Sequence, residues 1–195
     1  MITTIIFDLS EVFLRGLYGT HELLSKRFGI TIESSDLHVP ETKELFEGRI
    51  TEDEYWQAIL NKHQWSITIS ELKKIVRQNF KEIEGTREIV KNLKLRGYAL
   101  GLLSVHAREW IDHCEKEFVF HALFDSVLYS FEVSVCKPDK RAYELILKRL
   151  GKKPEECLFI DDNSENVIAA QEFGLQAILF TTALKLNDEL KKYVS

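Results

Sequence analysis

The chain has 195 residues, of which 45% are hydrophobic and 29% are charged. This composition is ordinary for a globular protein and excludes disordered and collagen-like chains, and the length accommodates one core domain with a small insert. The 26 basic and 31 acidic residues give a net charge of −5, which lacks the basic footprint of a general nucleic-acid binder. No apolar stretch approaches the roughly 20 residues that span a bilayer. We therefore expect neither a nucleic-acid partner nor a membrane partner.

The three cysteines, Cys114, Cys136 and Cys157, are odd in number and far apart in the sequence. This spacing fits neither a disulfide framework nor a thiolate zinc site, and it favours a reducing compartment. The N-terminal run Met1–Phe7 has no basic segment and is predicted to form a strand rather than a signal peptide. We expect a cytoplasmic protein that is a monomer or a weak homodimer.

In chain order, five short apolar runs are typical of strands buried on both faces of a parallel sheet. These runs are Ile2–Leu9, Tyr98–Ser104, Asp125–Tyr129, Cys157–Ile160 and Ala177–Phe180. Amphipathic helices are predicted between the later runs, with Thr86 capping one, Pro138 opening the next and Asn163–Phe173 forming the third. Gly151 and Gly174 stand where the last two helices would end. Strands that alternate with helices imply a parallel sheet with right-handed crossovers.

Residues 15–83, between the first two predicted strands, carry helical signals only. Thr20–Phe28 has apolar residues at helical spacing, Thr51–Glu54 is a capping-box sequence, and Ser70 precedes another periodic run. We predict an insert of three to four helices. The fold class is therefore α/β: a Rossmann-like parallel sheet sandwiched by helices, built from residues 1–14 and 84–195, with a small all-helical domain inserted after the first strand.

Polar side chains stand at the carboxyl ends of the predicted strands, where open α/β sheets bind ligands. Asp8 and Ser104 end the first two strands, Lys137 follows the third, and Asp161 and Asp162 follow the fourth. Three carboxylates close together raise one another's pKa unless a cation lies among them. Oxygen ligands favour Mg²⁺, whereas a lysine and a hydroxyl suit an anion such as phosphate. The set therefore predicts phosphoryl transfer through an acyl-phosphate intermediate.

Each of these residues taken alone has an ordinary structural explanation. A strand-end aspartate is usually a turn or cap residue, and an Asp-Asp pair before Asn163 is more often a helix N-cap than a metal site. Lys137 alone would most often be solvated, and Ser104 alone would be a turn hydroxyl. Their shared position at one end of successive strands is what favours a catalytic site.

The same residues resemble the motifs of the haloacid dehalogenase-like hydrolase superfamily, and the resemblance covers essentially the whole chain. The four motifs resemble Phe7–Val12, Leu102–Ser104, Cys136–Pro138 and Phe159–Asn166. The predicted insert lies where subfamily IA of that superfamily places its type-1 helical cap. Within it, Leu45–Trp56 resembles the cap of a branch that contains bacterial sugar-phosphate phosphatases similar to the glucose-1-phosphate phosphatase, and the N-terminal domain of soluble epoxide hydrolase.

The resemblance implies a metal-binding role for four positions. Asp8 would be the nucleophile and also a Mg²⁺ ligand, together with the backbone carbonyl of Ser10. Asp162 would be the carboxylate most directly on Mg²⁺. Asp161 would lie beside it, where it would hold Lys137 or complete the ligand shell.

The resemblance also implies which residues contact the phosphoryl group. Ser104 would hydrogen-bond the phosphoryl oxygens, and Lys137 would balance charge on the nucleophile and the phosphate. Val105 stands where many relatives have asparagine, so a side-chain contact is lost while the backbone N–H can remain. Asn166 would orient the fourth motif, although a polar residue in the first turns of a helix is an equally good explanation.

Ser10 is the main departure from the family pattern, because phosphatases of this family usually have an aspartate there as general acid and base. A hydroxyl cannot do this work at pH 7, and such catalysis typically contributes ~10²–10⁴-fold to the rate. Glu11 is the nearest carboxylate, but adjacent residues project differently, so the role is not transferred to it. The sugar-phosphate branch also often lacks this aspartate, so its absence need not abolish turnover.

Several further residues admit two interpretations. His106, Arg108 and Arg49 could contact an anionic substrate, but positions in an exposed loop or on a solvated helix face explain them better. Trp56 and Trp110 are more often packing anchors than substrate platforms.

These observations predict a Mg²⁺-dependent phosphatase acting on a small phosphorylated metabolite, with sugar phosphates as one option. One alternative is a phospho-ligand-binding protein whose turnover is weak or lost through Ser10. Another is a hydrolase of the same superfamily that cleaves a carbon–halogen or carbon–phosphorus bond. The Asp161–Asp162 pair argues against metal-independent dehalogenation, and Lys43 and Lys62 stand in no recognisable motif for a Schiff-base lysine.

Overall fold

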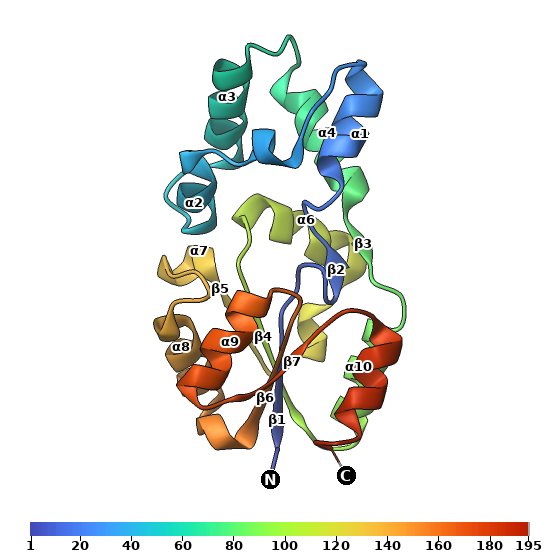
Figure 1. Cartoon of the computed structure of the whole chain (residues 1–195), viewed down its shortest axis with the longest axis vertical. Coiled ribbons are helices and arrows are strands. Elements are labelled where there is room, and N and C mark those ends of the chain that lie inside the picture. Colours follow the sequence, from blue (N-terminus) through green and yellow to red (C-terminus); the bar gives the residue numbers. More distant parts are fainter. Residues whose placement is uncertain (195) are drawn as a thin grey trace.

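The computed structural model describes residues 1–194 and has two parts, a sheet with flanking helices and a group of helices stacked on one end of it (Figure 1). The strands are β1 (Thr4–Phe7), β2 (Leu14–Arg15), β3 (Lys81–Glu82), β4 (Ala99–Ser104), β5 (Ser126–Tyr129), β6 (Cys157–Asp161) and β7 (Gln176–Leu179). The helices are α1 (Thr20–Phe28), α2 (Pro40–Phe46), α3 (Glu52–His63), α4 (Ile69–Asn79), α5 (Thr86–Leu95), α6 (Arg108–Phe118), α7 (Ser130–Val133), α8 (Lys140–Leu150), α9 (Ser164–Phe173) and α10 (Ala183–Leu190).

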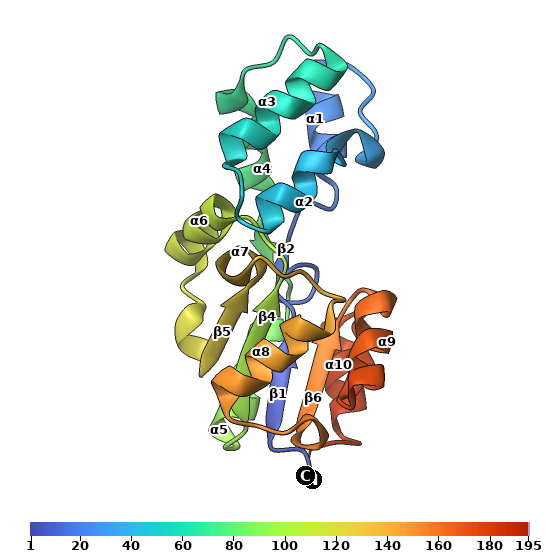
Figure 2. The ribbon, with the colours of Figure 1, turned by 90° about the vertical axis from the view of Figure 1, so that its left-hand side faces the viewer.

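The main sheet has five parallel strands in the order β5-β4-β1-β6-β7, so β1 lies at its centre. The side chains of β1 alternate between the faces, because Ile5 and Phe7 belong to one apolar cluster and Ile6 to another. Helices α8 and α9 cover the face of Ile6, and α5 and α10 belong to the cluster on the opposite face (Figure 2). The predicted α/β fold class is thereby confirmed.

Strand register brings the predicted site residues to one edge of the sheet. Phe7 of β1 pairs with Leu102 of β4 and with Ile160 of β6. Asp8 and Asp161 therefore come at the same level, and Ser104 ends the neighbouring strand. This edge faces the helices α1–α4 (Figure 1).

The segment between β2 and β3, residues 16–80, holds helices α1–α4 and is called the cap below. The cap joins the rest of the molecule through β2 and β3, which pair antiparallel as Leu14 with Glu82 and Arg15 with Lys81. The expectation of helical structure alone in residues 15–83 was therefore wrong at its ends. Two residues per strand give too short a pattern for alternation of polar and apolar side chains to be read from the sequence.

Helix starts differ from the sequence-based expectation at three places. Helix α5 has Gly85 as its N-cap rather than Thr86, and α8 begins after Asp139 rather than at Pro138, because the Asp139 carboxylate accepts a hydrogen bond from the N–H of Arg141. Helix α4 begins before Ser70, because the Thr68 hydroxyl accepts a hydrogen bond from the N–H of Glu71. The capping box before α3 and the helix ends at Gly151 and Gly174 are confirmed.

Within residues 1–194 the three cysteines are unpaired, and none of the helices is long and apolar enough to cross a membrane.

Candidate active site

Asp8 and Lys137 form a buried ion pair at the carboxyl end of the central strand. Lys137 Nζ lies 2.8 Å from Asp8 Oδ1, and the backbone N–H of Leu9 donates to the same oxygen at 2.7 Å. Lys137 also lies 5.3 Å from the centre of the Phe159 ring, which packs beneath its ammonium group. Both contacts that the described residues make with the Asp8 carboxylate fall on Oδ1, so Oδ2 is the oxygen available for a ligand or for attack.

Asp161 is completely engaged by its neighbours. Its carboxylate accepts hydrogen bonds from Lys137 Nζ at 2.6 Å, from the backbone N–H of Asn163 at 2.9 Å and from Asn166 Nδ2 at 3.0 and 3.2 Å. The backbone carbonyl of Asn166 in turn accepts a hydrogen bond from the Tyr143 hydroxyl at 2.8 Å, which holds Asn166 in place. Asp161 therefore positions Lys137, and Asn166 positions Asp161.

Asp162 differs from Asp161 in exposure and in its partners. It is exposed, and no other residue in the described part of the chain donates a hydrogen bond to its carboxylate. One carboxylate oxygen from each of Asp8, Asp161 and Asp162 lies within 4.8 Å of the others. A divalent cation at this cluster would take Asp8 and Asp162 as its freer carboxylates, because Asp161 already has a full set of donors.

The electrostatics of the cluster are those of a site with too few cations. Burial raises the pKa of Asp8 to about 7 despite the neighbouring Lys137, and Asp161 adds to the increase. Partial desolvation at the edge of the cluster, with Asp161 again adding to it, raises the pKa of Asp162 to about 6. Three carboxylates share one ammonium group, so a further positive charge would be strongly favoured here.

Ser104 is the unsatisfied polar group of this site. Its side chain is 1% exposed, and its hydroxyl has no hydrogen-bond partner among residues 1–194. A buried hydroxyl without a partner costs on the order of 1–3 kcal/mol, so such groups are rare unless a ligand uses them. An oxyanion placed between Ser104 and Lys137 would satisfy this hydroxyl.

The loop that follows Asp8 turns back on itself. The Glu11 carboxylate accepts a hydrogen bond from the backbone N–H of Gly16 at 2.8 Å, and Glu11 has a positive φ of 56°. Ser10 is half-buried, and a Cβ at residue 16 would come within 3.1 Å of its hydroxyl. The Glu11 carboxylate therefore closes the loop, which gives no support for assigning the acid–base role to it.

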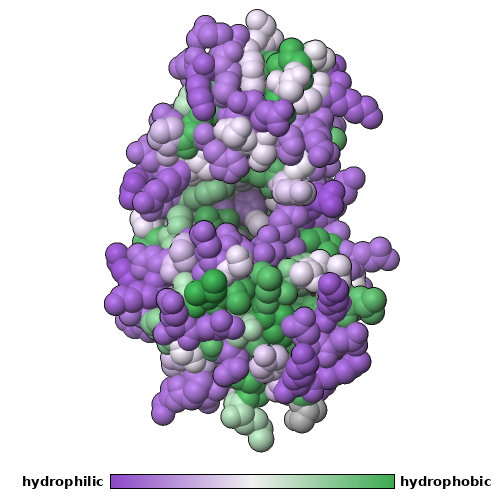
Figure 3. Space-filling model, in the orientation of Figure 1, coloured by the Kyte–Doolittle hydropathy of each residue, from purple (hydrophilic) through white to green (hydrophobic). Residues whose placement is uncertain are grey.

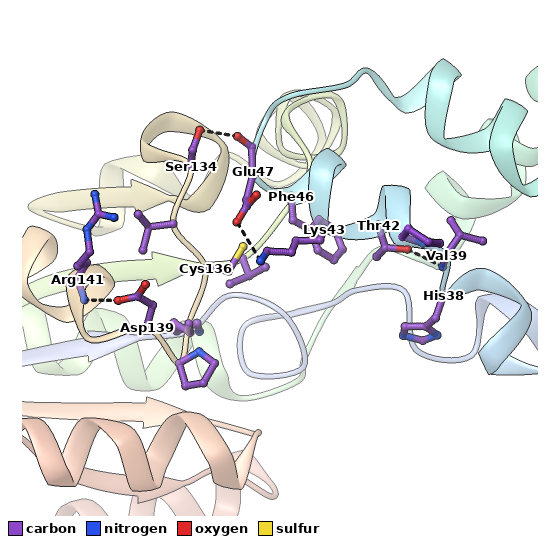
Figure 4. Close-up of a pocket in the computed structure, with 15 residues that line it drawn as sticks. His38, Val39, Thr42, Lys43, Phe46, Glu47, Ser134, Cys136, Asp139 and Arg141 are labelled. Atoms are coloured by element: carbon purple, nitrogen blue, oxygen red, sulfur yellow. Dashed lines mark hydrogen bonds and ion pairs between the residues drawn. The ribbon is translucent and has the colours of Figure 1, made fainter.

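A cavity of about 970 Å³ opens beside the charged cluster, between the cap and the rest of the molecule. Figure 4 shows its lining residues, and Figure 3 shows the surface hollowed between the two parts. Lys137 and Val105 form its inner wall, while α2 supplies Lys43 and Phe46 from the cap. The volume lies at the upper end of the roughly 300–1,000 Å³ typical of pockets for small organic ligands.

A family profile described as haloacid dehalogenase-like hydrolase matches residues 5–180. The chain belongs to the haloacid dehalogenase-like hydrolases. It is 30% identical over 112 residues to pyrophosphatase PpaX of Bacillus cereus, an alignment that covers 57% of this chain and 52% of that protein, about half its length. It is 26% identical over 198 residues to pyrophosphatase PpaX of Bacillus mycoides, with 98% of this chain and 89% of that protein covered.

The fold of this hydrolase is also similar to that of a solved family member from Bacteroides thetaiotaomicron in complex with magnesium and inorganic phosphate. The TM-score is 0.79 at 19% sequence identity, and the alignment covers 93% of this chain and 96% of that one. At this identity the likeness concerns the fold, and it confirms the architecture inferred from the sequence.

Two basic residues near the carboxyl edge of the sheet, His106 and Arg108, lie away from the cavity. His106 is buried against Phe80 and Trp110, and burial lowers its pKa to about 4. Arg108 stacks on the Phe131 ring at 4.5 Å. Neither residue lines the cavity, and Arg108 is exposed as expected, but the expectation of an exposed loop is wrong for His106 because aromatic rings enclose its imidazole.

Arg49 and Lys43 of the cap each lie beside the Glu47 carboxylate. The guanidinium of Arg49 lies 2.5 Å from the Glu47 carboxylate. Lys43 does line the cavity, but its side chain is 74% exposed and its ammonium group lies 3.8 Å from the Glu47 carboxylate. Neither solvent exposure nor an adjacent carboxylate favours the neutral amine that a Schiff base requires.

Sequence reasoning missed Glu52, the only fully buried carboxylate of the described cap residues. In the sequence it stands only as a member of the capping-box segment Thr51–Glu54, which predicts an exposed position. The signal that could have drawn attention to it is a tryptophan four residues later on the same helix face, which offers an indole N–H.

Proposed function

We propose that this hydrolase is a Mg²⁺-dependent phosphatase that acts on a small phosphorylated metabolite through an aspartyl-phosphate on Asp8. The observation that carries the proposal is the buried Ser104 hydroxyl, which lacks a partner among residues 1–194 and stands at the same edge as Lys137 and Asp8. A phosphoryl oxygen would accept a hydrogen bond from Ser104 and an ion pair from Lys137.

The chemistry starts at Asp8. Its Oδ2 attacks phosphorus, the bond from phosphorus to the leaving oxygen breaks, and an acyl phosphate forms. Water then attacks phosphorus, the bond to Asp8 breaks, and inorganic phosphate and the free carboxylate are released. Lys137, anchored by Asp161, holds Asp8 Oδ1 in place and balances charge on the transferred group.

Asp8, Asp162 and the carbonyl of Ser10 would hold Mg²⁺, with Asp161 completing the arrangement through Lys137. When bound, the cation supplies electrostatic stabilisation of the phosphoryl oxygens. The donor set supports this assignment because it consists of oxygens, and because desolvation together with the neighbouring Asp161 raises the pKa values of Asp8 and Asp162, a cost that a bound cation would relieve. Val105 would contribute its backbone N–H at the phosphate.

The cavity supports an organic leaving group. Its volume exceeds what inorganic phosphate requires, and its wall combines apolar residues such as Phe46 and Val105 with polar ones. A sugar phosphate fits these properties. Because two relatives are named pyrophosphatases, inorganic pyrophosphate is the competing substrate. We further propose that the protein is cytoplasmic and is a monomer or a weak homodimer.

The decisive experiment measures phosphate release from sugar phosphates, nucleotides, acetyl phosphate and inorganic pyrophosphate, with and without Mg²⁺. We expect Mg²⁺-dependent release that falls at least ~10³-fold in Asp8→Asn, because the nucleophile is lost. Asp125→Asn is the matched control, since Asp125 accepts a hydrogen bond from the N–H of Leu100 and belongs to the loop that enters β5, away from the site. Release that survives in Asp8→Asn would contradict the mechanism.

The binding-only alternative follows from Ser10 and has its own signature. It predicts that Mg²⁺ and inorganic phosphate bind, as measured by calorimetry, while none of the phosphorylated compounds is turned over. Turnover of any organic phosphate with loss in Asp8→Asn excludes it.

A further inference from the structure

A second cluster of buried charged and aromatic groups lies where the cap meets the rest of the molecule. Its centre is the Glu52 carboxylate, at the first residue of α3, with no solvent-exposed surface. Arg77 of α4 binds it in a bidentate ion pair, with Nη1 and Nη2 at 2.7 and 2.6 Å from its two oxygens. Two indole N–H groups complete the set, from Trp56 at 3.1 Å and from Trp110 at 2.7 Å.

Of these donors, Trp110 alone comes from outside the cap. Trp56 and Arg77 belong to α3 and α4, whereas Trp110 belongs to α6 beside the sheet. A second hydrogen bond runs in the opposite direction, from the backbone N–H of Glu52 to the carboxylate of Glu109 at 3.2 Å. Two hydrogen bonds therefore join the start of α3 to the start of α6, one through the backbone N–H of Glu52 and one through its carboxylate.

A close backbone contact lies beside this attachment. The carbonyl of Glu47 accepts a hydrogen bond from the Ser134 hydroxyl at 2.9 Å. Gly48, with a φ of 71°, packs so tightly that a Cβ there would come within 2.5 Å of the Phe131 carbonyl oxygen. These two contacts hold the segment after α2 against α7 and the residue that follows it.

Trp110 connects this attachment to the cavity. Its ring lies 6.0 Å from that of Phe46, which lines the cavity from α2, and 5.7 Å from that of His106. His106 comes two residues after Ser104, on the loop that carries the phosphate-binding hydroxyl. One side chain thus contacts the cap wall of the cavity, the catalytic loop and the buried carboxylate.

We propose that Trp110 is a positioning residue, whose indole N–H bond to Glu52 docks the cap and sets the Phe46 wall of the cavity against the phosphate-binding loop. The kinetic consequence rests on the proposed phosphatase function, whereas the docking itself does not. Removing the N–H while keeping an aromatic ring would leave the packing largely in place and free the cap to separate from α6.

The test compares Trp110→Phe with Trp56→Phe. Both variants remove one indole N–H from the same carboxylate, but only Trp110→Phe removes a bond that crosses the boundary. Hydrogen–deuterium exchange of the peptide that contains Gly48–Asp53 reports docking directly, because the Glu52 N–H is bonded to Glu109. We expect exchange about tenfold faster in Trp110→Phe, the factor for losing a hydrogen bond to a buried charge, and less than about twofold faster in Trp56→Phe.

The kinetic arm uses p-nitrophenyl phosphate and acetyl phosphate with Mg²⁺. Trp110→Phe is expected to raise KM for the aryl ester about tenfold with less than a threefold change in kcat, because the cap wall contacts the leaving group and not the reacting atoms. Acetyl phosphate, whose leaving group reaches the cap least, should change less than about threefold. Equal exchange and equal kinetics in the two Trp→Phe variants would overturn the proposal.

Two further outcomes are decided independently. If Trp110→Phe does not fold, Glu109→Met removes the acceptor of the other bond across the boundary, at a half-buried position, and unchanged exchange in that variant overturns the proposal because α6 would then not hold the start of α3. If the unmodified protein releases no phosphate from any compound, the proposed function fails while the exchange comparison still decides the docking role.

Discussion

The molecule holds two clusters of charged side chains that are largely buried, and the two differ in how fully their carboxylates are paired. At the carboxyl edge of the sheet, Asp8, Asp161 and Asp162 share one ammonium, and a hydroxyl beside them lacks a partner among the described residues. At the cap boundary, Glu52 is met by a bidentate arginine and two indole N–H groups. The first cluster has too few cationic and hydrogen-bonding partners for its carboxylates and its hydroxyl. In the second cluster, each oxygen of the carboxylate has a donor. We call them the incomplete and the complete cluster.

The directions of the pKa shifts report this difference. Burial raises the pKa of Asp8 and of Asp162 because their neighbours do not compensate for the lost hydration. Burial also acts to raise the pKa of Glu52, but the hydrogen bonds from Arg77 and Trp110 outweigh it, so its pKa is lowered. A buried carboxylate whose charge is not compensated by hydrogen bonds or ion pairs therefore indicates a ligand site. A buried carboxylate with a full set of donors indicates a structural role.

The largest expected effect comes from breaking the complete cluster. Glu52→Ala leaves Arg77 without its carboxylate and two indole N–H groups without an acceptor, so the free energy of unfolding should fall by about 3–5 kcal/mol. Urea titration followed by circular dichroism measures it. Glu54→Ala is the matched control in the same helical turn, where an exposed capping-box carboxylate is lost and about 0.5–1 kcal/mol is expected. Equal losses in the two variants would mean that the buried cluster contributes no more than a helix cap.

The next effect tests whether the incomplete cluster also lacks a catalytic acid. Ser10→Asp places a carboxyl group two residues after Asp8, where the family's phosphatases usually carry one. We expect kcat to rise by up to ~10²-fold, at the low end of general acid–base catalysis, when measured with saturating substrate and Mg²⁺. Ser10→Asn is the isosteric control without a titratable group. If both variants behave alike, protons are supplied from elsewhere.

The incomplete cluster was visible in the sequence, and the complete one was not. Asp8, Ser104 and Asp161 end strands whose apolar runs are easily recognised, and parallel strands must bring their carboxyl ends to one edge. Glu52 and Trp110 stand 58 residues apart on helices whose mutual packing is set by tertiary structure alone. Local periodicity carries no information about such a pair.

The same distinction explains the smaller errors. The helices of the cap were predicted because their spacing and capping boxes are local, whereas β2 and β3 pair across the whole cap. The cavity wall contributed by Phe46 was likewise out of reach, because it depends on how the cap is docked.

Mg²⁺ should stabilise the protein in a pH-dependent way. Because the pKa values of Asp8 and Asp162 are raised from 3.8 to about 7 and about 6, their contribution to stability is fully present below pH 3.8 and is lost as pH rises from there to about 7. Mg²⁺ binds the ionised forms, so its stabilising effect should appear as pH rises through the same range. Near pH 8, Mg²⁺ at ten times its Kd should add about 1.4 kcal/mol, and near pH 5 it should add much less. Thermal unfolding at matched ionic strength measures both, and equal stabilisation at the two pH values would contradict the site.

The smallest effect is the one that contrasts the clusters most directly. In the absence of Mg²⁺ near pH 8, Asp162→Asn should raise the free energy of unfolding by about 1 kcal/mol, a value reduced by solvent screening because this carboxylate is exposed. Glu52→Gln should lower it under the same conditions, because that carboxylate is compensated by Arg77. Excess Mg²⁺ should remove the advantage of Asp162→Asn, since the unmodified protein then gains a cation that the variant binds poorly. A loss of stability in Asp162→Asn without Mg²⁺ would show that its carboxylate is a structural group like Glu52, and the distinction between the two clusters would fail at its most exposed member.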